Sequence, residues 1–139
     1  MDIAALVAWI VTALGGAVLL ARWLGGGGLR RQGAGTTRFP APVVFGHFLL
    51  AAAGLVVWIV YLAADRDALA WTGLVLLVVV ALLGFTLFAR WIPVRRTTPG
   101  DAESTPAERH LPVPVVAAHG LLGATTLVLA LLAALGVGS

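Results

Sequence analysis

The chain of 139 residues contains no cysteine, which excludes disulfide bonds, thiolate metal sites and cysteine nucleophiles. Charge is also scarce, since only 11% of the residues are charged, against about a quarter in soluble domains. So few charges could not coat the surface of a soluble protein in which 60% of the residues are apolar. The composition therefore excludes a disordered chain and most soluble enzymes, and it indicates an integral membrane protein.

Four long apolar runs are present, at residues 3–24, 41–64, 68–89 and 113–137. Each has about 22 to 25 residues, which as a helix would rise about 33 to 37 Å and cross a hydrocarbon core of about 30 Å. None of the runs has an acidic residue or an arginine in its central part. We expect four transmembrane helices in one transmembrane domain, residues 1–139, embedded in a lipid bilayer.

Lysine is absent as well, so arginine alone reports the orientation in the membrane. Arg66 lies in the short turn between the second and third runs, and the other eight arginines lie in or beside the connections 25–40 and 92–112. Because cytoplasmic loops are enriched in arginine and lysine, we expect both connections in the cytoplasm and both termini outside. The basic charge then reflects topology, and nucleic acid is not an expected partner. Trp23 and Trp91 would belong to an aromatic belt at the cytoplasmic face.

Arginine in place of lysine, together with abundant Ala, Gly, Val and Leu, suggests a GC-rich genome. We therefore expect a multi-pass protein of the bacterial plasma membrane.

The chain also contains an internal repeat. With a shift of 72 residues, ten of the seventeen positions from Pro40 to Val56 are identical, in the pattern Pro-x-Pro-Val-Val-x-x-His-x-Leu-Leu. With a shift of 68 residues, ten positions between Leu6 and Trp23 are identical. Hydrophobicity alone does not explain the matches of Pro, His, Arg and Trp. The repeat unit is a pair of helices, at residues 1–66 and again at 67–139.

Because each unit holds two spans, both copies have the same orientation in the membrane. A pseudo-two-fold axis along the membrane normal should relate them. The predicted fold is an all-α, integral membrane four-helix bundle with up-down-up-down connectivity.

The most informative residues of the repeat are His47 and His119. Each follows a Pro-x-Pro pair by about five residues, which places it about 7 to 9 Å into its span at the cytoplasmic side. Ionisable side chains inside a membrane span are costly and usually face the protein interior or a water path. If both histidines face inward, the pseudo-symmetry places them opposite one another.

Two further sets of matched positions accompany the histidines. Small residues follow each histidine on its own helix face, which permits close packing or leaves room for a flat cofactor: Ala51 and Gly54 after His47, and Gly123 and Thr126 after His119. Arg22 and Arg90 end the first and third spans, where they either anchor the helices at the interface or pair with anionic groups of a ligand.

With paired histidines in a four-helix membrane architecture, the chain resembles small membrane b-type cytochromes. The resemblance implies one haem b held by His47 and His119, which would also be the metal ligands, and a role in electron transfer. The propionates of the haem would point toward Arg22 and Arg90. A second haem is not expected, because the spans hold only one histidine per repeat.

Other interpretations stay open. The chain could be a non-catalytic accessory or assembly subunit of a larger membrane complex, or a membrane protein that binds a quinone or another small molecule. Its partner would be a membrane redox complex or a second copy in a homodimer. A zinc site lacks further protein ligands, and no Ser/His/Asp set is visible, so we expect no catalytic activity of its own. Trp58 and Tyr61 would face lipid or the interface.

Overall fold

A computed structural model of the protein describes residues 1–96 and 105–137. Its four long helices are α1 (Asp2–Gly25), α3 (Ala41–Ala64), α4 (Asp67–Arg96) and α5 (Val113–Ala134). Two short elements, the helix α2 (Arg30–Gly33) and the 3₁₀ helix η1 (Ala107–His110), lie in the connections. Each of the four long helices is long and apolar enough to cross a membrane. The all-helical, membrane-compatible architecture expected from the sequence is therefore present.

The helices α3 and α5 begin in the same way. Pro40 and Pro112 lie in extended backbone immediately before them, and a second proline, Pro42 or Pro114, lies in the first turn. Proline suits this place because the first amides of a helix have no partner within it. This shared start puts His47 and His119 at the same position in their helices.

The apolar runs and the helices differ at two ends. The helix α4 continues past the predicted end at Ala89 to Arg96 and includes Pro93 in its last turns. Polar residues end an apolar run, but they do not end the backbone hydrogen bonding of a helix. The helix α5 stops at Ala134, before the predicted end at Val137, because Gly136 turns the chain with a φ of +73°.

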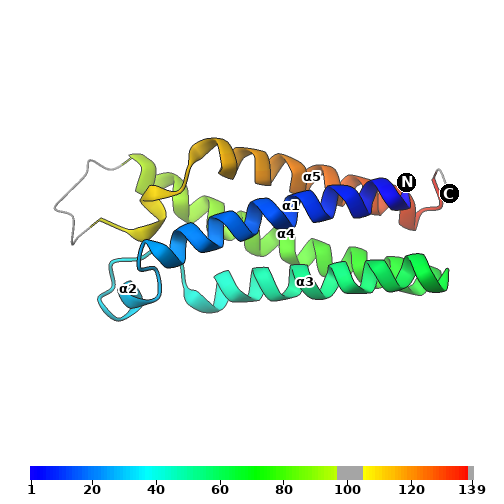
Figure 1. The fold of residues 1–139 in the computed structure, drawn as a ribbon, viewed down its shortest axis with the longest axis horizontal. Coiled ribbons are helices and arrows are strands. Elements are labelled where there is room, and N and C mark those ends of the chain that lie inside the picture. The colour runs from blue at the N-terminus through cyan, green and yellow to red at the C-terminus, as the bar shows by residue number, and fades with distance from the viewer. Residues whose placement is uncertain (97–104, 138–139) are drawn as a thin grey trace.

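The four long helices lie lengthwise beside one another (Figure 1). Both chain termini lie at one end, which we call the terminal end, and α2 and η1 lie at the other, which we call the loop end. The helix α3 packs mainly on α4 and α1 mainly on α5, with smaller contacts between α4 and α5 and between α1 and α3. Around the bundle the order is α1, α3, α4, α5, so α3 lies diagonally opposite α5.

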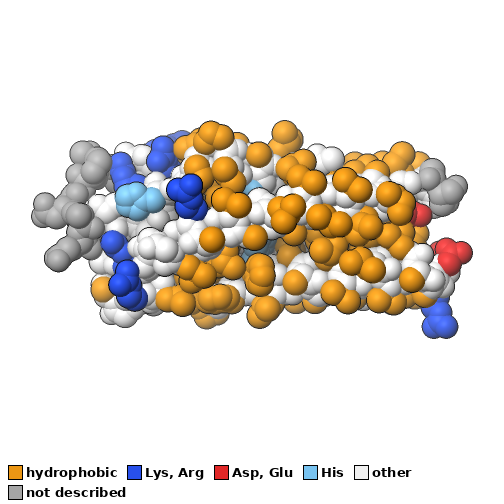
Figure 2. Space-filling model, in the orientation of Figure 1, with side chains coloured by type: hydrophobic (Ala, Val, Ile, Leu, Met, Phe, Trp, Pro, Cys, Tyr) orange, Lys and Arg blue, Asp and Glu red, His pale blue; other side chains and the backbone are white. Residues whose placement is uncertain are grey.

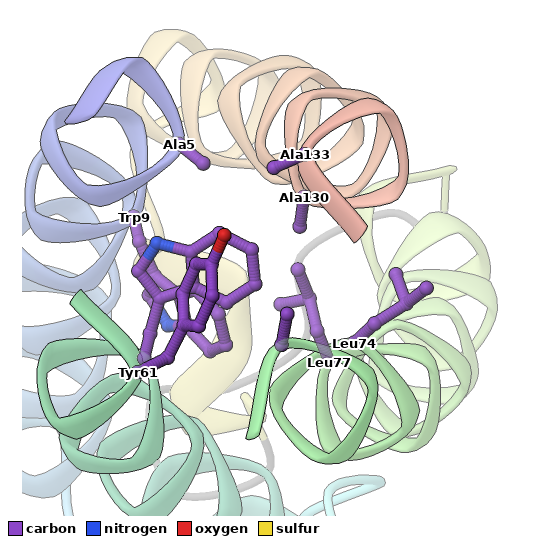
Figure 3. Close-up of a cluster of buried hydrophobic side chains, with 9 residues drawn as sticks. Ala5, Trp9, Tyr61, Leu74, Leu77, Ala130 and Ala133 are labelled. Carbon is purple, nitrogen blue, oxygen red and sulfur yellow. The ribbon is translucent and has the colours of Figure 1, made fainter. Parts of the chain in front are cut away.

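Two clusters of buried apolar side chains fill the bundle, one toward each end. The terminal cluster contains large aromatic rings from α1 and α3 that face small side chains of α5 (Figure 3), and its members are Ala5, Trp9, Trp58, Tyr61, Ala70, Leu74, Leu77, Ala130 and Ala133. The loop cluster consists of Trp23, Phe39, Val44, Trp91, Ala107 and Leu111. The level of His47 and His119 lies between these clusters along the helices.

The burial of four aromatic residues corrects the sequence-based expectation. Trp23 is 1% exposed and Trp91 is 7% exposed, so neither belongs to a lipid-facing belt. Trp58 is fully buried and Tyr61 nearly so, and they do not face lipid. The belt rule concerns the depth of a residue along the membrane normal, and it carries no information about the face of the helix on which the residue lies.

The outer surface matches the membrane assignment. Apolar side chains cover the middle of the molecule, and arginine side chains gather at the loop end (Figure 2). Several large apolar residues are widely exposed, among them Leu82, Phe85 and Leu121. In water, such a continuous apolar surface would be unfavourable, whereas lipid accommodates it.

Candidate functional site

The candidate site is formed by His47 of α3 and His119 of α5. The centres of their rings lie 6.1 Å apart, and the rings meet edge to face with an angle of 74° between their planes. Both side chains are half-buried. Because α3 and α5 are diagonal in the bundle, the two rings face one another across its interior.

Each ring is oriented by one main-chain carbonyl of a neighbouring helix. His47 Nδ1 lies 2.9 Å from the carbonyl oxygen of Val80, and His119 Nδ1 lies 2.9 Å from that of Thr12. A carbonyl oxygen only accepts, so Nδ1 must carry the hydrogen in both rings. In the neutral imidazole this leaves Nε2 with a free lone pair, the arrangement typical of a metal-ligating histidine. Thr12 and Val80 are themselves 68 residues apart, like the matched positions of the repeat.

Two glycines make room for the rings. A Cβ atom on Gly16 would lie 3.0 Å from His119 Cε1, and one on Gly84 would lie 2.9 Å from His47 Cε1. Side chains at these positions would push the rings away, so the close approach requires glycine. Sequence reasoning did not assign these residues to the site, although the match of Gly16 with Gly84 in the repeat was the available signal.

The four small residues predicted to line a cofactor have different surroundings in the structure. Gly54 packs against Trp9, whose Cζ2 atom would lie 2.8 Å from an added Cβ. Thr126 is buried, and its hydroxyl oxygen lies 3.2 Å from that of Thr12. An added Cβ on Gly123 would reach only a methyl group of Thr12, at 3.8 Å. Ala51 is half-buried.

The two predicted arginines lie toward the loop end of α1 and α4. Arg22 and Arg90 are both exposed. One guanidinium nitrogen of Arg90 donates to the carbonyl of Arg38 at 3.2 Å. The third histidine, His110, is exposed in η1 and lies outside the pair.

A buried acid joins the two connections at the loop end. Glu108 of η1 is fully buried, and its carboxylate accepts hydrogen bonds from the Thr37 hydroxyl, at 2.9 Å, and from the backbone amide of Arg38. The Glu108 carbonyl accepts from the Trp91 indole at 3.1 Å. Sequence reasoning missed this residue, because one acid in a polar, proline-rich connection carries no signal of burial.

The donor set of the site limits what it can bind. Within residues 1–96 and 105–137 there is no group of three or more His, Cys, Asp or Glu side chains placed to hold a metal ion. A structural zinc ion takes about four protein ligands, so the histidine pair alone would leave it incomplete. A haem iron receives its equatorial ligands from the macrocycle and needs only two axial side chains. Two imidazoles with free Nε2 atoms match the number and type of side-chain ligands that a b-type haem takes.

Comparison of the chain with protein-family models, with curated proteins and with solved structures returns no match.

Proposed function

We propose that this protein is an integral membrane protein that binds one b-type haem between His47 and His119 and takes part in electron transfer. The observation that carries the proposal is the facing pair of rings, 6.1 Å apart, each fixed through Nδ1 by a helix carbonyl. The separation of the ring centres is short enough for both imidazoles to contact one shared ligand.

The residues around the pair have distinct roles in this proposal. His47 and His119 would hold the haem through their ring nitrogens, and the carbonyls of Thr12 and Val80 orient the rings and would strengthen them as ligands. Gly16 and Gly84 keep space beside the rings. The surrounding apolar helices exclude water. The haem, when bound, would supply a one-electron iron couple, and its potential would depend on these ligands and their surroundings.

The proposal extends to the whole architecture. We interpret the two helix pairs as tandem copies related by a pseudo-two-fold axis along the membrane normal, with up-down-up-down connectivity. The matched carbonyls and glycines, each offset by 68 residues, support this interpretation. The gathering of arginine at the loop end supports a cytoplasmic position for that end, with both termini outside. Arg22 and Arg90 lie at the end toward which the propionates of a bound haem would point.

The experiment is haem loading of the protein expressed with a haem precursor and purified in detergent. We expect a Soret absorbance band that the His47→Ala and His119→Ala variants both lose. His110→Ala is the matched control, because it removes the one exposed histidine and should keep the band. A wild-type protein that stays colourless, or two single variants that keep the full band, would contradict the proposal. A colourless protein that co-purifies with a stoichiometric membrane partner would favour the accessory-subunit alternative.

A further inference from the structure

Trp23 is a buried hydrogen-bond donor without an acceptor in the described part of the chain. The side chain is 1% exposed, and its indole nitrogen is completely buried with no hydrogen-bond partner among residues 1–96 and 105–137. Buried polar groups are nearly always paired, so an orphaned N–H is a reason to look for a bound group that accepts from it.

The position of Trp23 relates it to the histidine pair. It follows Gly16, the glycine that makes room for His119, by seven residues on α1. Seven residues are about two helical turns, so Trp23 lies on the same inward face, about 10 Å further toward the loop end. Arg22 precedes it directly and is exposed instead. The buried donor therefore lies in the loop cluster at the basic end of the bundle, with its ring against Gly28 and about two turns from the histidine level.

Trp91 provides the internal comparison. It occupies the matched position on α4, seven residues after Gly84, and it is buried in the same loop cluster. Its indole nitrogen donates to the carbonyl of Glu108 at 3.1 Å. Within the described residues, the indole N–H of Trp91 therefore has an acceptor and that of Trp23 has none.

We propose that the Trp23 indole N–H donates to a carboxylate of the ligand held between His47 and His119, namely a propionate of the haem. This inference rests on the proposed function. A buried carboxylate is costly unless donors satisfy it, and a hydrogen bond to a charged acceptor is stronger than one to a neutral acceptor. The free N–H of Trp23 and the exposed arginines of the loop end together favour an anionic group at this depth.

The test compares Trp23→Phe with Trp91→Phe in the full-length protein. We expect Trp23→Phe to bind haem about tenfold or more weakly, while the ligand-free protein unfolds at the same or a higher denaturant concentration, because the change removes an unpaired polar atom. Trp91→Phe should behave in the opposite way. It removes the Trp91 donor from the Glu108 carbonyl, which keeps only the Leu111 amide at 3.3 Å, so the ligand-free protein loses stability and haem affinity changes less.

An iron porphyrin with ethyl groups in place of the propionates makes the test specific. Wild type and Trp23→Phe should bind this porphyrin equally well, because it offers Trp23 no acceptor. If wild type binds haem and Trp23→Phe binds it just as tightly, the inference is wrong. It is also wrong if the Trp23 effect is the same with both porphyrins. If wild type binds neither porphyrin, the proposed function fails instead.

Discussion

The two helix pairs contribute matching residues at the histidine level of the bundle and different residues at its terminal end. At the histidine level, the residues match: a histidine, a carbonyl partner and a glycine occur on each side. At the terminal end, α3 contributes Trp58 and Tyr61, whereas the positions 72 residues later on α5 are Ala130 and Ala133. A core needs only a constant total volume, so large and small side chains can face one another. The proposed haem site would need both histidines, so it would require the match.

The terminal end should carry most of the stability and little of the binding. Trp58→Ala should lower the free energy of unfolding by about 3–5 kcal/mol, because it leaves a cavity and removes the donor to the Asp2 carbonyl at 3.2 Å. The haem spectrum should not change. Denaturant titration in detergent and absorbance spectroscopy measure the two effects. A loss of the Soret band at unchanged stability would reverse the proposed division between the two regions.

The same region offers a compensating substitution. Ala130→Trp alone should overpack the terminal cluster and cost about 1–3 kcal/mol, since Ala130 is fully buried in a cluster that already contains Trp9 and Trp58. Combined with Trp58→Ala, it should restore part of the lost stability, as coupled neighbours do. Strictly additive losses in the double variant would show that the two positions do not share one volume.

The histidine level should respond to a much smaller change. Gly84→Ala introduces a Cβ that would lie 2.9 Å from His47 Cε1, so the ring must move away from the Val80 carbonyl. We expect a cost of about 1–3 kcal/mol in stability and a clear loss of haem affinity. Gly120→Ala is the matched control: it lies next to His119, but an added Cβ would meet nothing within 4 Å. Equal haem affinities of the two variants would contradict the assigned role of Gly84.

These regions also show what the sequence could and could not predict. The helices followed from hydropathy, and the proline starts placed both histidines at one depth. The continuation of α4 to Arg96 did not follow, because polar residues do not stop a helix. The inward direction of Trp23 and Trp58 could not be predicted either. A sequence shows how deep a residue lies along a span, but when a helix is apolar on all sides it does not show which side faces the protein interior. The role of Gly84 needed the position of the His47 ring.

At the loop end, the buried carboxylate of Glu108 links the two connections, and we expect its removal to have an effect of intermediate size. Glu108→Ala should destabilise the protein by about 1–3 kcal/mol, because the Thr37 hydroxyl and the Arg38 amide lose their acceptors. Limited proteolysis should then cut the connection around residues 34–40 faster, while the Soret band remains. Protection equal to wild type would show that other contacts hold this end.

The smallest effect should come from making the histidine level more symmetric. Thr12→Val introduces on α1 the residue that α4 has at position 80, and it keeps the backbone carbonyl that accepts from His119. The hydroxyl contacts with the Ala8 carbonyl, at 2.8 Å, and with Thr126, at 3.2 Å, are lost, at a cost of about 0.5–1.5 kcal/mol. Thermal unfolding measures the loss of stability, and the haem absorbance spectrum, which should not change, reports on the site. A displaced Soret band would mean that the Thr12 hydroxyl itself belongs to the site.

The coordination of haem by the purified protein tests the central claim most directly. Titration with haem, followed by absorbance and electron paramagnetic resonance, reports the stoichiometry and the number of axial ligands. The account predicts one haem per chain with a six-coordinate, low-spin iron in both oxidation states, since both His47 and His119 would bind the iron. A five-coordinate, high-spin iron, or no saturable uptake of haem, would contradict it.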